Sequence, residues 1–99
     1  MVNHVVSFKL KDFSLNEKTA VAEELKSLLE GLKEKITELK YLEVGINHDL
    51  TSVNYDLVLI SHFDSLEPLK AYQVHPEHQK VVKRVLETTT ARAAVDFIF

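Results

Sequence analysis

Two stretches of this 99-residue chain are apolar on both faces of an extended strand, and this feature constrains the fold more than any other. In the stretch 55–63, written YDLVLISHF, Leu57 points to one face and Val58 to the other, because side chains alternate along a strand. The stretch 2–10, VNHVVSFKL, is also apolar on both sides. A sheet built from such strands needs a cover on each face, since large exposed apolar patches are rare on monomers.

The rest of the chain supplies the other elements of a small domain. Ser14 and Glu17 form a capping box, which marks the start of a helix. Apolar residues then recur at intervals of three and four, so the helix is expected to run to about residue 38. Residues 42–46 alternate between apolar and polar as a half-buried strand does, and residues 91–99 form a last strand of the same kind.

A second helical segment follows the strand 55–63 and is interrupted by a proline. Asp64 is predicted to cap its first helix, in a box with Glu67. This helix is expected to end near Val74, because Pro76 cannot continue a helix and is favoured as the first residue of a new one.

The predicted order of elements is βαββαβ, which is typical of the ferredoxin-like fold. This is an α+β architecture in which helices cover one face of an antiparallel four-stranded sheet. One domain over residues 1–99 is expected from the length. Because the helices cover one face only, a second copy of the chain is expected to cover the other, as a homodimer. The alternative is a second face that is only partly apolar and is tolerated in water.

Charge and composition exclude several classes of partner. The net charge is −3 and no basic stripe is present, which argues against nucleic acid and anionic membranes. The longest apolar run, Leu57 to Ile60, is too short to span a bilayer, and no signal peptide is expected. The chain has no cysteine, so disulfides and thiolate chemistry are excluded. These features predict a cytoplasmic protein, and no cofactor is expected.

The stretch 72–80, YQVHPEHQK, gathers a tyrosine and two of the five histidines around a proline. If Pro76 is the first helical residue, His75 lies at the helix cap and His78 in the first turn, on the apolar stripe of that helix. The field of a helix N-terminus and burial both favour the neutral form of an imidazole. A buried neutral imidazole is suited to act as a general base.

His4 and Tyr72 are expected to share a cavity with His78. His4 lies on the same face of the first strand as Phe8, and Tyr72 lies on the flank of the preceding helix. If that face of the sheet meets the helices, the three side chains converge. The alternative is that the histidines are packing residues and Tyr72 anchors its helix. A metal site is not expected, because His75 and His78 are poorly placed across a proline and lack a third ligand.

Three blocks of sequence, HVVSFK at 4–9, YDLVLISHFDSLE at 55–67 and AYQVHPEHQKVV at 71–82, carry a resemblance to a known family. The chain resembles the stress-responsive A/B barrel domain (Dabb) family over almost its whole length. The motif Tyr-x-x-His-Pro-x-His in the last block is the most specific part. The resemblance implies a ferredoxin-like protomer and a homodimeric α/β barrel.

The resemblance implies less about activity. Many members of the family are described as stress-induced proteins of unknown activity, and some plant members are polyketide cyclases that act by aldol condensation. In those cyclases a histidine is the base and a tyrosine stabilises the developing charge; the matching positions are His78 and Tyr72. His4 matches a further histidine of that pocket. The cyclases carry another histidine where this chain has Leu57, so the pocket here is less polar.

These observations together predict a stress-responsive protein that binds a small hydrophobic carbonyl or phenolic compound. Whether it is an enzyme stays open, since a non-catalytic structural or binding homodimer is the second hypothesis. A haem-handling or cofactor-free monooxygenase is a third, by analogy with related barrels. The candidate catalytic residues are His78, Tyr72 and His4, and the candidate ligand-binding residues are His75, Phe8 and Leu57.

Overall fold

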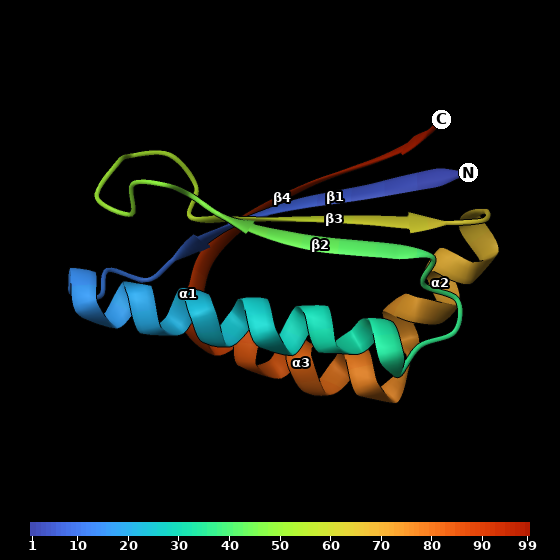
Figure 1. Ribbon diagram of the computed structural model, residues 1–99, viewed down its shortest axis with the longest axis horizontal. Helices are drawn as coiled ribbons and strands as arrows, with labels where there is room; N and C mark the ends of the chain where they lie inside the picture. The colour runs from blue at the N-terminus through green and yellow to red at the C-terminus, as the bar shows by residue number, and fades with distance from the viewer.

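The computed structural model describes residues 1–99 and contains a single antiparallel sheet with helices beside it (Figure 1). The strand order is β2–β3–β1–β4, so the first and third strands are central. The predicted ferredoxin-like α+β fold is confirmed. The strands are β1 (Val2–Leu10), β2 (Tyr41–Ile46), β3 (Leu57–Phe63) and β4 (Thr89–Ile98); the helices are α1 (Leu15–Glu30), α2 (Leu66–Val74) and α3 (Pro76–Thr88).

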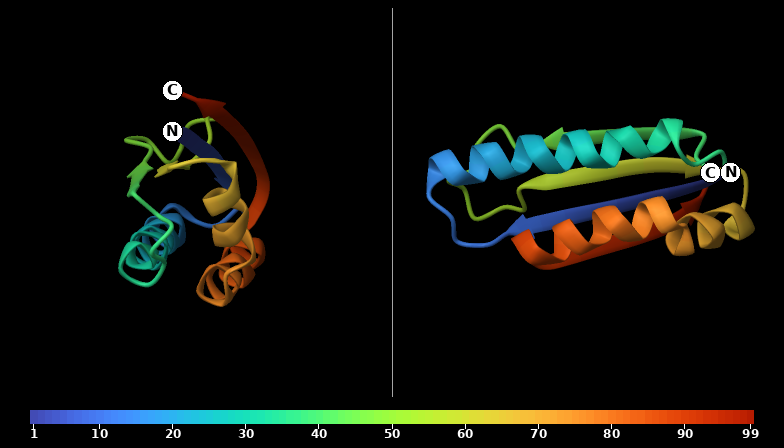
Figure 2. Two further views of the ribbon diagram at one scale, coloured as in Figure 1. Left: turned by 90° about the vertical axis from the view of Figure 1, so that its right-hand side faces the viewer. Right: turned by 90° about the horizontal axis from the view of Figure 1, so that it is seen from below.

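Both long helices lie on the same face of the sheet. Helix α1 runs along β2 and β3, and α3 runs beside it along β1 and β4 (Figure 2). On β1 every second residue from Val2 to Leu10 is buried, while the residues between them are half-buried. The buried set includes His4, so the face that carries His4 is the one that meets the helices. None of the helices is both long enough and apolar enough to cross a bilayer.

The first helix starts as expected and ends earlier. The Ser14 hydroxyl accepts from the Glu17 N–H (3.3 Å), so the predicted N-cap is confirmed. The Glu17 carboxylate accepts from the Ser14 hydroxyl (3.0 Å) and not from the Ser14 backbone N–H, so the reciprocal half of the capping box is not formed. The α-helix does not continue to residue 38, because the chain winds into a 3-10 turn over Gly31–Glu34. Glycine is a poor helix former, and the turn begins at this residue.

The second helix begins one residue later than the sequence suggests. Its N-cap is Ser65, and no side chain caps it, so the prediction that Asp64 is the cap is wrong. The chain stays extended through Ser65, which leaves Asp64 too far from the first helical turn. The Asp64 carboxylate lies 3.8 Å from the ammonium of Lys40 instead.

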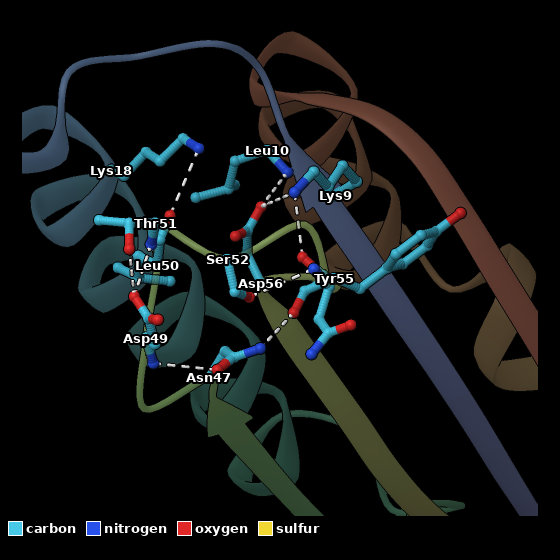
Figure 3. A network of polar contacts seen from close by, with 11 residues as sticks. Lys9, Leu10, Lys18, Asn47, Asp49, Leu50, Thr51, Ser52, Tyr55 and Asp56 are labelled. Carbon is cyan, nitrogen blue, oxygen red and sulfur yellow. Dashed lines mark hydrogen bonds and ion pairs between the residues drawn. The ribbon is translucent and has the colours of Figure 1, made fainter.

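Strand β3 starts at Leu57 rather than at residue 55, because Asp56 belongs to the loop that precedes it. Asp56 is buried; its carboxylate accepts from the Leu10 N–H and its own N–H donates to the Phe8 carbonyl, both at 2.8 Å. Figure 3 shows this residue inside a network of loop contacts. These bonds hold the end of β1 beside the start of β3.

The last strand has no cover of its own. It starts at Thr89, earlier than predicted, and its residues from Thr90 to Ile98 are all exposed. It is the edge strand that pairs only with β1. Apolar side chains are among these exposed residues, including Val95 and Phe97.

The face of the sheet away from the helices, called the open face below, is also apolar. It carries the half-buried side chains of Val58 and Ile60, as the two-sided sequence pattern predicts. At one end of this face the His62 ring lies between two others, 4.7 Å from Tyr41 and 4.8 Å from Phe99 between ring centroids. No helix of the chain covers this face (Figure 2).

Candidate functional site

The junction between α2 and α3 takes its form from Pro76. Because proline has no N–H, a new helix starts there. The side chain of His75 caps this helix, accepting from the Glu77 N–H through Nδ1 at 3.1 Å. The carbonyl of Gln73, at the end of α2, is one of the carbonyls that a helix end leaves without a helical partner. His78 supplies a partner, since its Nδ1 lies 3.1 Å from that carbonyl oxygen.

This contact assigns the proton on the His78 ring. A carbonyl oxygen can only accept, so Nδ1 is the donor and the neutral ring keeps its lone pair on Nε2. Burial lowers the pKa of His78 from its ordinary value of 6.5, and the bond to Gln73 partly opposes this. The charges of His4, Arg92 and His75 lower the pKa further. The ring is therefore neutral at pH 7, and Nε2 is its basic atom.

A cavity of about 290 Å³ lies between α3 and the covered face of the sheet. His78 is in its wall, together with His4 and Phe8 from β1 and Arg92 from β4. Apolar walls with a few polar groups are typical of small-molecule sites. The aliphatic part of the wall comprises Val6, Leu29, Leu59, Val82, Val85 and Leu86.

His4 is held in the cavity wall by a carboxylate on the neighbouring strand. The β1–β4 register pairs His4 with Asp96, and the His4 Nδ1 hydrogen bonds to the Asp96 carboxylate. A carboxylate only accepts, so Nδ1 is the donor here too. Nothing in the sequence identifies Asp96 as this partner, because the register of two strands so far apart in the chain cannot be read from either one.

Tyr72 links the two histidines. Its ring centroid is 4.3 Å from that of His78 and 6.5 Å from that of His4. Its hydroxyl is buried and has no hydrogen-bond partner. Burial raises the pKa of Tyr72 to about 12, so the group stays protonated. A buried donor without an acceptor costs about 1–3 kcal/mol, so an acceptor that reaches this hydroxyl is stabilised.

The candidate residues from the sequence fall in three places. His78, His4 and Phe8 line the cavity, and Tyr72 lies against both histidine rings without forming part of the wall. His75 caps α3 and Leu57 packs in the core, both outside the wall.

The cavity also contains polar residues that the sequence does not reveal. Arg92 reaches it only because β4 pairs with β1, opposite Phe8. Gln73 and Gln79 line it from the helix junction. No group of three or more histidine, cysteine, aspartate or glutamate side chains is arranged to hold a metal ion.

The chain has clear relatives among known proteins. The sequence model of the stress responsive A/B barrel domain, Dabb, matches residues 2–99. A stress-response A/B barrel domain-containing protein of Arabidopsis thaliana is 33% identical over 103 residues, which is 99% of this chain and 47% of that protein. The chain thus spans about half the length of this curated relative.

Solved structures share the fold of this chain. A dimeric protein of unknown function with a ferredoxin-like fold, from Bacteroides fragilis, has a TM-score of 0.90 and 38% identity over 99% of this chain and 95% of its own. The hydroxynitrile lyase of Passiflora edulis has a TM-score of 0.80 over 99% of this chain and 92% of its own. At 14% identity it shares the fold alone. With a family match from residue 2 to residue 99, this chain belongs to the stress responsive A/B barrel domain family.

Proposed function

We propose that this protein binds a small, largely apolar carbonyl or phenolic compound in the cavity beside α3, and that His78 acts on it as a general base. The contact between His78 and the Gln73 carbonyl carries this proposal, because it leaves a neutral ring with Nε2 as its basic atom. A general base must be unprotonated at the working pH and must reach the proton that it removes. His78 meets the first condition, and its place in the cavity wall supports the second.

In the proposed reaction, Nε2 of His78 takes a proton from the carbon next to a ligand carbonyl. The electron pair of the broken C–H bond moves onto the carbonyl oxygen, which becomes enolate-like and needs a hydrogen-bond donor. Tyr72 is the proposed donor, because its hydroxyl is protonated and has no partner in the protein. The Tyr72 hydroxyl is buried outside the cavity wall and its ring contacts His78, so this step requires the carbonyl oxygen to enter past the His78 ring.

The fate of the enolate depends on the ligand. In a compound with a second carbonyl, the enolate carbon bonds to that carbonyl carbon and the second oxygen becomes an alkoxide. The alkoxide takes back the proton held on Nε2 of His78, and loss of water completes an aldol condensation like that of the polyketide cyclases that this chain resembles. His4, held in place by Asp96, orients the ligand from the cavity wall. Phe8 supplies apolar surface in the same wall.

A homodimer is the proposed assembly. Its support is the apolar open face and the dimeric state of the Bacteroides fragilis relative. A role in a stress response is proposed from the name of the family. A cytoplasmic location is proposed because the chain, having no cysteine, contains none of the disulfides that are typical of oxidising compartments.

The first test is a thermal-shift screen of phenolic, polyketide-like and short-chain carbonyl compounds. A true ligand should raise the melting temperature of the native protein by several degrees and that of His78→Ala much less, because bound ligand stabilises the folded state. The matched control is His48→Ala, which removes an exposed loop histidine. A library that shifts neither native protein nor control would count against a ligand site.

The second test follows the chemistry. Exchange of the ligand's α-hydrogen for deuterium, measured by NMR, should be fast with the native protein and with His48→Ala. It should be absent with His78→Ala and slowed with Tyr72→Phe. Exchange at the native rate in His78→Ala would remove His78 from the reaction.

The alternative function is a non-catalytic dimer in which His78 only holds the helix junction. The bond from His78 to the Gln73 carbonyl favours this role as well. In that case His78→Gln should lower stability and leave the binding of every screened compound unchanged.

A further inference from the structure

The two arginines of the chain differ in their partners. Arg84, on α3, donates through two nitrogens to the carboxylate of Glu24, at 2.7 and 2.9 Å. Arg92, on β4, makes no ion pair and no side-chain hydrogen bond within the chain. A guanidinium presents a planar fork of donors that fits a carboxylate. The guanidinium of Arg92 has no such partner within the chain.

Arg92 is placed at the cavity by the sheet. The register pairs it with Phe8, so both lie on the covered side, and both line the cavity. Its charge reaches His78, whose pKa it helps to lower. The unused guanidinium therefore belongs to the same space as the proposed base.

The cavity wall offers Arg92 no counter-charge. Among the residues of the wall it is the only one with a permanent charge, and none is an aspartate or glutamate. The nearest carboxylate on this face of β4 is Asp96, four residues along a strand and so about 13 Å away. Asp96 is already bonded to His4. Arg92 is exposed on the edge strand, so a carboxylate can reach it from solvent, and its charge-assisted hydrogen bonds to a carboxylate are stronger than those between neutral groups.

We propose that Arg92 binds a carboxylate of the ligand, so that the cavity takes a small phenolic or carbonyl acid in preference to a neutral compound. This inference rests on the proposed function and narrows its substrate class. A carboxylate held by Arg92 directs the rest of the molecule along the apolar wall toward His78. The volume of about 290 Å³ suits a compound with one ring and short substituents.

The test compares 4-hydroxybenzoate with its neutral methyl ester, which has the same ring and lacks the charge. Affinities are measured by calorimetry at pH 7, where the carboxylic acid is ionised and the ester is neutral, for the native protein, Arg92→Gln, Arg92→Lys and Arg84→Gln. The native protein should bind the acid at least about tenfold more tightly than the ester, which a charge-assisted hydrogen bond provides. Arg92→Gln should lose this preference and keep the native affinity for the ester.

The other two variants separate charge from geometry. Arg92→Lys should keep part of the preference, since an ammonium has the charge without the fork. Arg84→Gln removes the same charge outside the cavity wall and should bind both compounds as the native protein does.

Four results would overturn the inference. One is equal affinity of the native protein for acid and ester, or an Arg92→Gln variant that keeps the preference; binding of the ester would then leave the proposed site standing. Another is Arg92→Gln that becomes monomeric in gel filtration and loses both compounds, which would assign Arg92 to the subunit contact. The last is a native protein that binds neither these compounds nor any in the wider screen, which would end the proposed function as well.

Discussion

The two faces of the sheet differ in how far one copy of the chain completes them. On the face that meets the helices, residues such as Val6 and Leu59 are 1% and 2% exposed, and the cavity with its histidines lies there. On the open face, Val58 and Ile60 are only half-buried. One chain therefore forms the whole candidate site by itself. It leaves an apolar surface exposed, which the second copy of the proposed dimer would cover.

The largest effect is expected on the open face. Ile60→Lys should turn the proposed dimer into a folded monomer, because a lysine there is solvated in the monomer and would be buried without a partner in that dimer. By symmetry each dimer contains two such charges, at about 3 kcal/mol each, so dissociation should become easier by roughly ten-thousand-fold. Analytical ultracentrifugation over a range of concentrations measures this.

The control for that change is Ala20→Lys, which adds the same charge at an exposed position of α1. It should remain dimeric. If Ile60→Lys also remains dimeric at the native affinity, the open face is not the subunit interface. The open face would then need no second copy to cover it.

A smaller effect distinguishes two hydroxyls on the covered side. The Ser61 hydroxyl donates to the His4 carbonyl at 3.0 Å, whereas the Tyr72 hydroxyl has no partner. Ser61→Ala should lower the free energy of unfolding by about 1 kcal/mol, and Tyr72→Phe should raise it by about the same amount. Urea unfolding at one fixed protein concentration gives both values. Equal losses in the two variants would mean that Tyr72 has a bonding partner after all.

The smallest effect is a change in pH dependence. Burial lowers the pKa of His78 in the folded state below 6.5. At a pH between the two pKa values, His78 is therefore protonated in the unfolded chain and neutral in the folded one. The contribution of the neutral His78 to the free energy of unfolding is fully present above pH 6.5. It is lost as the pH falls from 6.5 to the pKa of the folded state. His78→Gln should have a flatter stability profile between about pH 7 and about pH 5. His48→Gln should follow the native curve, and a native slope in His78→Gln would contradict the burial of a neutral imidazole.

Much of the fold could be predicted because it depends on local patterns. The N-cap at Ser14 and the new helix at Pro76 are local, and both lie where the sequence predicts them. The cap of α2 was predicted one residue early, because Asp64 and Ser65 are both good capping residues and only the extended conformation of Ser65 decides between them.

Only part of the candidate site could be predicted from local sequence patterns. Periodicity and the family resemblance indicate His78 and Tyr72, since both lie close together in the chain. Asp96 and Arg92 come from the last strand, and their places depend on the pairing of β4 with β1. That register is a tertiary property, so the carboxylate on His4 and the cation in the cavity could not be found from the sequence.

The most direct test of the central claim is the protonation state of His78, read from ¹⁵N NMR of the imidazole rings with His78→Gln to assign the signal. At pH 7 the account expects a neutral ring with the proton on Nδ1 and a lone pair on Nε2, and a titration midpoint below 6.5. A proton on Nε2 of the neutral ring would contradict it, because the basic nitrogen would then face the Gln73 carbonyl and not the ligand. A midpoint at or above 6.5 would contradict the lowering of the His78 pKa by burial.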